Sequence, residues 1–183
     1  LHLKHNERAV FQMADVSRIK VQETENVFWE SKVNENTTGD DNSAVKTLTF
    51  TNTFRPVLYV QKKLAGVPEG VSLNESDNIF TFKIETKDGK GTYTPVADAE
   101  FWYVDSARLD GSIPNKLHTG RTDANGEFQL KPGEIIALFP GFTGTEYQLT
   151  ETNSGESWLC TSPQSTGILR AEGSSKIFTN YYK

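Results

Sequence analysis

Two similar segments of the sequence, residues 50–54 and 178–182, each carry an asparagine where a β-strand would carry an apolar side chain. Side chains alternate between the two faces of a strand, so Phe178, Asn180 and Tyr182 are predicted to share one face. If that face is buried, the amide of Asn180 needs a reason to be there, because burying an unpaired amide costs about 1–3 kcal/mol. We therefore predict that Asn180 is a reactant that forms a covalent bond with an upstream lysine.

The two segments close two copies of an internal repeat. The other matching stretches are residues 1–4 with 128–131, residues 19–24 with 147–152, and Trp29 with Trp158. Residues 1–54 are therefore expected to be the second half of a domain whose complete copy occupies residues 55–183. Pro56 marks the junction, because proline interrupts the hydrogen bonding of a strand.

The complete copy reads as a series of short strands separated by turns. Alternating apolar residues occur at 58–64, 79–84, 99–104, 126–130 and 134–139. The turn signals between them are Asp88-Gly89, Asp110-Gly111, Asn125-Gly126 and Pro132-Gly133. Helical periodicity is weak throughout. We predict an all-β, Ig-like β-sandwich, one complete domain preceded by the C-terminal half of a similar domain.

The composition excludes several classes of function. A net charge of −5, without a run of Lys or Arg, argues against nucleic-acid binding. No apolar stretch is long enough to cross a membrane. The single Cys160 excludes an intramolecular disulfide and is expected to be a small buried hydrophobe. The scattered histidines have no partners at metal-ligand spacing, so no metal and no cofactor are expected.

Three polar residues fall on the apolar faces of predicted strands: Lys62, Glu151 and Asn180. Burial disfavours charge, so Lys62 would be a neutral nucleophile and Glu151 a protonated acid. Glu151 would hydrogen-bond the Asn180 carbonyl oxygen, polarise its carbon for attack and pass a proton to the leaving ammonia. The fold would hold the three groups together. A register slip of one residue would make Lys63 the buried amine, and that alternative stays open.

A lysine in the first strand, a Tyr-x-Leu-x-Glu-Thr stretch at residues 147–152 and a closing Phe-x-Asn strand resemble CnaB-type and pilin isopeptide-linkage domains. These modules occur in Gram-positive surface proteins. The resemblance covers residues 55–183 and, in half, residues 1–54. It implies a spontaneous isopeptide bond between Lys62 and Asn180, with Glu151 as the catalyst.

The leading half-domain contains Glu23 and Asn52 at the matching positions, but no lysine of a first strand precedes them. This second site is therefore expected to be incomplete. Its lysine would come from a segment missing from this sequence or from a strand donated by another chain.

The resemblance implies a structural role as a stalk or pilin module. The protein would lie outside the cell, attached to the wall of a Gram-positive type bacterium, beside neighbouring domains or subunits of the same fibre. Its cross-linking reaction would run once, so it is not expected to be a turnover enzyme. The alternative is an adhesive module, in which residues 93–117 contact a host ligand.

Overall fold

The computed structural model describes residues 7–10, 20–23, 29–38, 45–73, 78–110, 112 and 114–183. The chain divides into two compact units, Leu1–Thr53 and Phe54–Lys183. Parts of the predicted repeat, residues 1–4, 19 and 24, and the predicted turn residue Gly111 lie outside the described residues.

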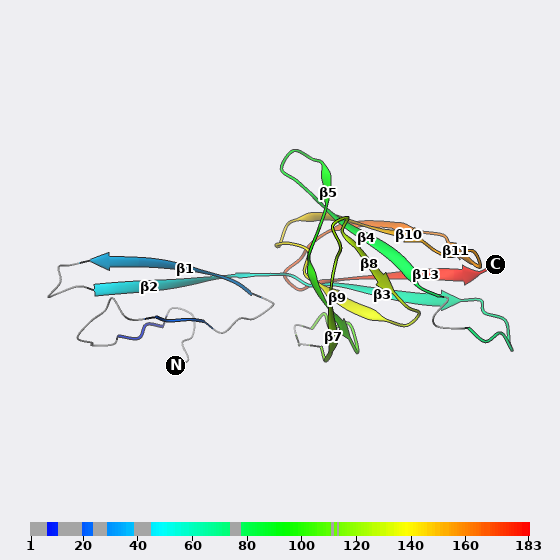
Figure 1. The fold of residues 1–183 in the computed structure, drawn as a ribbon, viewed down its shortest axis with the longest axis horizontal. Coiled ribbons are helices and arrows are strands. Elements are labelled where there is room, and N and C mark those ends of the chain that lie inside the picture. The colour runs from blue at the N-terminus through cyan, green and yellow to red at the C-terminus, as the bar shows by residue number, and fades with distance from the viewer. Residues whose placement is uncertain are drawn as a thin grey trace. The chain divides into compact units, whose positions relative to one another are not determined.

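The predicted fold class is confirmed, because the described residues form β-strands and no helix (Figure 1). The strands are β1 (Trp29–Thr38), β2 (Val45–Phe54), β3 (Leu58–Ala65), β4 (Phe80–Lys87), β5 (Tyr93–Pro95), β6 (Glu100–Val104), β7 (Lys116–Arg121), β8 (Glu127–Leu130), β9 (Ile135–Leu138), β10 (Glu146–Asn153), β11 (Trp158–Cys160), β12 (Gln164–Ile168) and β13 (Ser174–Tyr182).

The first unit contains one sheet among its described residues, in which β1 pairs with β2. The second unit is a sandwich of two sheets. One has the strand order β11-β13-β3-β9-β6-β7. The other has the order β12-β10-β4-β5, and β8 also pairs with β4. Large apolar side chains from both sheets fill the space between them, including Val60, Phe82, Ile136 and Leu149, each fully buried.

The strands that the alternation predicted correspond to β3, β4, β6, β8 and β9. Four strands that it did not predict, β5, β7, β11 and β12, lie at the ends of the two sheets. An edge strand contributes few side chains to the core, so its apolar pattern is weak. In β7, for example, five of the six residues are exposed.

The first and last strands of the second unit, β3 and β13, lie side by side and run parallel (Figure 1). The register places Phe178 opposite Lys62 and Asn180 opposite Leu64. Because side chains alternate, Lys62 and Asn180 point to the same face of the sheet, offset by two residues. That face is the one that packs against the second sheet.

The predicted turn at Asn125-Gly126 shows why only glycine fits there. Gly126 has a φ of 75°, in the left-handed region that glycine adopts most readily. A Cβ atom added at Gly126 would lie 2.5 Å from the backbone oxygen of Ile84. The Ile84 amide donates a hydrogen bond to the Gly126 oxygen at 2.9 Å, so neither backbone can move away freely.

We expect Gly126→Ala to lower the free energy of unfolding by about 2–4 kcal/mol, since it adds a steric clash to backbone strain. Gly133→Ala is the matched control. Gly133 has a φ of 84°, but an added Cβ would meet nothing within 4 Å, so its cost should be about 1 kcal/mol. Urea unfolding measures both, and equal losses would show that the close approach to Ile84 is unimportant.

Candidate functional site

The three polar residues that the sequence singled out come together in the interior of the second unit. Lys62 lies on β3 and Asn180 on β13 of one sheet, whereas Glu151 projects from β10 of the opposite sheet. The exposed fractions are 0% for Lys62, 0% for Asn180 and 5% for Glu151. In each strand the preceding residue on the same face is apolar and buried (Val60, Leu149 and Phe178), so the period of two directs all three side chains inward.

The carboxylate of Glu151 bridges the other two side chains. Lys62 Nζ donates a hydrogen bond to Oε2 of Glu151 at 2.9 Å. Asn180 Nδ2 donates to the other oxygen, Oε1, at 2.5 Å. Each carboxylate oxygen therefore faces one nitrogen, that of the amine on one side and that of the amide on the other.

The Asn180 amide is turned differently from what the sequence predicted. Glu151 was expected to hydrogen-bond the Asn180 carbonyl oxygen, but the amide nitrogen makes this contact. Among the described residues, Asn180 Oδ1 is the buried side-chain polar atom that lacks a hydrogen-bond partner. In this arrangement Glu151 faces the nitrogen that would leave as ammonia.

Aromatic rings enclose the Lys62 amine. Its Nζ lies 4.2 Å from the centre of the Phe80 ring and 6.0 Å from that of Phe82. The Phe178 ring packs edge-on against Phe82, with 5.1 Å between ring centres. These rings keep water from the amine of Lys62. The neighbouring Lys63, by contrast, is exposed.

The pKa of Lys62 is lowered from its ordinary value, chiefly because burial penalises the charged ammonium. The hydrogen bond and the charge of Glu151 act in the opposite direction, but burial prevails. The neutral, nucleophilic form of the amine is therefore more accessible at Lys62 than at a lysine in water.

Sequence reasoning missed the contact that Cys160 makes with Glu151, because Cys160 was expected to be a small buried hydrophobe. Cys160 is only partly buried, and it lies on β11 directly opposite Asn180 of β13. Its Sγ donates to Oε2 of Glu151 at 3.6 Å. The signal that could have revealed it is the repeat: Cys160 follows Trp158 by two positions, and Ser31 follows Trp29 by two positions.

The first unit brings Glu23 and Asn52 together in a similar contact. Asn52 Nδ2 donates to Oε1 of Glu23 at 2.8 Å. Ser31 Oγ donates to Oε2 of the same carboxylate at 2.6 Å. The hydrogen bond from Ser31, followed by that from Asn52, holds the pKa of Glu23 below its ordinary value. All three residues are exposed.

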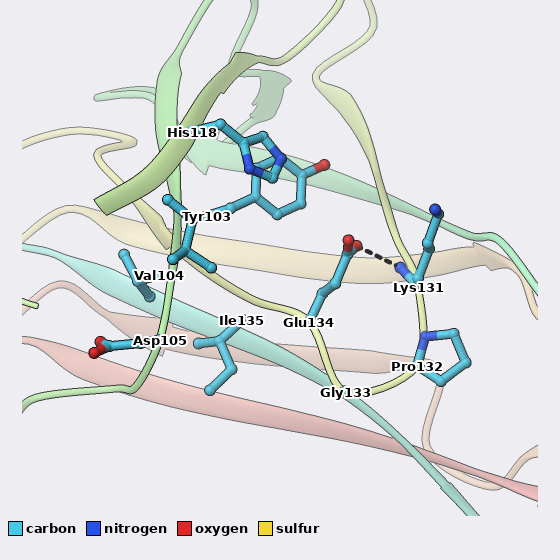
Figure 2. A pocket seen from close by; sticks show the side chains of 10 residues that line it. Tyr103, Val104, Asp105, His118, Lys131, Pro132, Gly133, Glu134 and Ile135 are labelled. Carbon is cyan, nitrogen blue, oxygen red and sulfur yellow. Dashed lines mark hydrogen bonds between the residues drawn. The ribbon is translucent and has the colours of Figure 1, made fainter. Parts of the chain in front are cut away.

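A shallow hollow in the second unit is lined by residues of β6, β7 and the turn before β9, and none of the three site residues lines it (Figure 2). The His118 ring stacks on Tyr103 there, with 3.9 Å between ring centres. The carboxylate of Glu134 accepts a hydrogen bond from the backbone nitrogen of Lys131 at 2.7 Å. Unlike the interior site, the hollow does not bring an amine, a carboxyl group and a carboxamide together.

The part of the chain that the structure describes contains no group of His, Cys, Asp or Glu residues suited to a metal ion. Nor does it contain a helix long and apolar enough to cross a membrane.

Comparison with solved structures finds similarity to pilus proteins. The major pilin from Streptococcus pyogenes is 17% identical, with a TM-score of 0.43, over 88% of this chain and 67% of the pilin. The minor pilin GBS52 from Streptococcus agalactiae is 14% identical, with a TM-score of 0.33, over 77% of this chain and 53% of that protein. The pilus-presented adhesin Spy0125 is 16% identical, with a TM-score of 0.42, over 68% of this chain. The match spans only 27% of that adhesin.

A comparison with curated proteins found no match. The family model described as "Domain of unknown function (DUF7601)" matches residues 57–182, which is most of the chain and nearly all of the second unit. The chain therefore belongs to this family of domains.

Proposed function

We propose that the second unit cross-links itself through an isopeptide bond between Lys62 and Asn180, and that it serves as a load-bearing module of a surface fibre. The observation that carries the proposal is the bridge made by Glu151, which contacts the nitrogens of both side chains inside an apolar core. Such a site has the nucleophile, the electrophile and a group able to move a proton between them.

In the proposed reaction, the neutral Lys62 amine attacks Cγ of Asn180 and a new carbon–nitrogen bond forms. The amine gives up a proton to Oε2 of Glu151, which lies beside it. Oε1 delivers a proton to Nδ2 of Asn180, the old carbon–nitrogen bond breaks, and ammonia leaves. Glu151 enters this step with its proton on Oε1 and leaves it with a proton on Oε2, so the carboxyl group keeps one proton, one amide replaces another, and the balance is one ammonia lost.

The bond would stabilise the unit against unfolding. It joins residues 62 and 180, which are 118 positions apart in the sequence. By the chain-entropy model of a cross-link, closing a loop of this size stabilises the fold by about 4–5 kcal/mol. Linking the two side chains also replaces the buried amine of Lys62 with a neutral amide, which needs less solvation.

The topology explains why such a bond would suit a protein under tension. The chain enters the second unit just before β3 and leaves it after β13, and these two strands are parallel neighbours. A pulling force would therefore shear β3 along β13. With Lys62 bonded to Asn180, the force would pass through the bond, and residues 63–179 would lie outside the load path.

This load path, together with the resemblance of the sequence motifs, favours a stalk on the surface of a Gram-positive type bacterium, joined to neighbouring domains of the same fibre.

The bond should be visible in the intact mass of the folded protein. We expect the unchanged chain to be lighter than its sequence by one ammonia, whereas Lys62→Met and Glu151→Gln should keep the full mass. Glutamine retains the shape of Glu151 but cannot relay a proton. Lys63→Met is the matched control and should still lose ammonia, because Lys63 is exposed. A full mass for the unchanged chain would refute the bond.

The load-bearing role can be tested by pulling single molecules from their two ends. The unchanged second unit should show no extension from residues 63–179, because the bond removes them from the load path. Glu151→Gln, which lacks the bond, should release them as a discrete extension step. A step of the same length in the unchanged protein would exclude the proposed role even if the bond were present.

For the first unit we propose that a lysine-bearing strand completes the site at Glu23 and Asn52. Among the described residues β2 pairs with β1 alone, and the opposite edge of β2 corresponds to the edge of β13 that takes β3. Trp29 is 45% exposed whereas its counterpart Trp158 is 3% exposed, as expected if a covering strand is needed. The strand would come from a segment upstream or from another chain.

A synthetic peptide with the sequence of residues 56–66 provides the probe for this second site. Mixed with the full chain, it should form an adduct whose mass is the sum of the two less one ammonia, with the new bond at Asn52. The chain with Asn52→Ala, and a peptide with arginine in place of the lysine that matches Lys62, should give no adduct. An adduct that persists in Asn52→Ala, or none with the unchanged pair, would contradict completion by such a strand.

A further inference from the structure

Cys160 lies in the reaction centre of the second unit, although the reaction as described above does not use it. Its backbone pairs with that of Asn180, and its Sγ lies 3.6 Å from Oε2 of Glu151. Oε2 is also the oxygen that accepts the hydrogen bond from Lys62. Two donors therefore converge on Oε2, whereas Oε1 faces the amide nitrogen of Asn180.

The first unit makes the same contact with a different residue. Ser31 Oγ donates to Oε2 of Glu23 at 2.6 Å, and Asn52 Nδ2 contacts Oε1. Ser31 and Cys160 each lie two positions after the tryptophan of their repeat, on the strand next to the one that carries the asparagine. Each unit thus places a side-chain donor against Oε2 of its own glutamate: the hydroxyl of Ser31 at Glu23 and the thiol of Cys160 at Glu151.

This contact matters because Lys62 cannot hold Glu151 in place throughout the reaction. When the Lys62 nitrogen bonds to Asn180, it gives up a proton and turns towards the amide carbon, so its hydrogen bond to Oε2 weakens. A carboxyl group without a donor on Oε2 is free to rotate away from the leaving nitrogen. Cys160 is the donor that remains.

The thiol is suited to this task at neutral pH. Burial raises the pKa of Cys160, and the neighbouring carboxylate of Glu151 adds to the effect. The sulfur therefore keeps its proton and can donate it in a hydrogen bond. Lys62 acts in the opposite direction on the thiol, but burial dominates.

We propose that Cys160 is a positioning residue for isopeptide formation, whose S–H holds Oε2 of Glu151 so that Oε1 stays directed at the departing nitrogen of Asn180. The inference rests on the proposed cross-linking function and adds a residue to its machinery. In the first unit, Ser31 takes the equivalent position at Glu23.

The test measures how fast the ammonia is lost. The full chain and its variants are made by cell-free translation with a thiol reductant, translation is stopped, and intact mass is followed over time in the protease-resistant, folded fraction. Cys160→Ala and Cys160→Val both remove the donor, and valine is the larger of the two replacements. Cys160→Ser keeps a donor at the same position.

We expect bond formation to be about fivefold slower in Cys160→Ala and Cys160→Val, which corresponds to the loss of one ordinary hydrogen bond. Cys160→Ser should react at close to the unchanged rate. If Cys160 had only a structural role, Cys160→Ser would form the bond as slowly as Cys160→Ala.

Two results would overturn the role of Cys160 but leave the proposed cross-link standing. One is an equal rate of bond formation in the unchanged chain and all three variants. The other is a Cys160→Ser variant as slow as Cys160→Ala and Cys160→Val. If the unchanged chain never loses ammonia, the proposed function fails and this inference fails with it. Valine provides a second chain without a donor in case the alanine variant does not fold, because its branched side chain suits a strand.

Discussion

The second unit depends on the carboxylate of Glu151, which bridges the side chains of Lys62 and Asn180 inside an apolar core. An isolated buried amine or carboxylate costs several kcal/mol, and the cost falls only when the groups satisfy one another. Glu151 reaches across from the opposite sheet and accepts hydrogen bonds from Lys62 Nζ and Asn180 Nδ2, whereas Asn180 Oδ1 has no partner among the described residues. The same desolvation that makes the arrangement costly lowers the pKa of Lys62 and so favours its nucleophilic form. The cost of burying this site and its proposed reactivity therefore have one physical origin.

The topology of the sheet determines what the proposed bond would join. Most neighbouring strands in the unit are antiparallel, but β3 and β13 are parallel. Parallel neighbours lie far apart in the sequence, so a link between them encloses nearly the whole unit. The side chains that meet at this pair come from the first and last strands. A contact between these two strands is a contact between the two ends of the unit.

The two units place similar contacts in different surroundings. Glu23, Ser31 and Asn52 reproduce the contacts of Glu151, Cys160 and Asn180, yet all three are exposed in the first unit. There the hydrogen bonds from Ser31 and Asn52 hold the pKa of Glu23 below its ordinary value, so its carboxylate is a weaker acceptor for a proton. Water also competes for every polar group. In the proposed reaction, burial by a covering strand is the difference that decides whether the same residues react.

The sequence by itself determined the all-β class and the inward direction of Lys62, Glu151 and Asn180, because alternation along a strand is a local property. It also favoured Lys62 over Lys63, and the structure buries the first and exposes the second. Only the tertiary structure decided the rest. The edge strands β5, β7, β11 and β12 carry little apolar pattern, since sheet neighbours rather than core packing define them. The orientation of the Asn180 amide and the contact of Cys160 with Glu151 depend on distances between strands that are remote in sequence, and no local pattern encodes those distances.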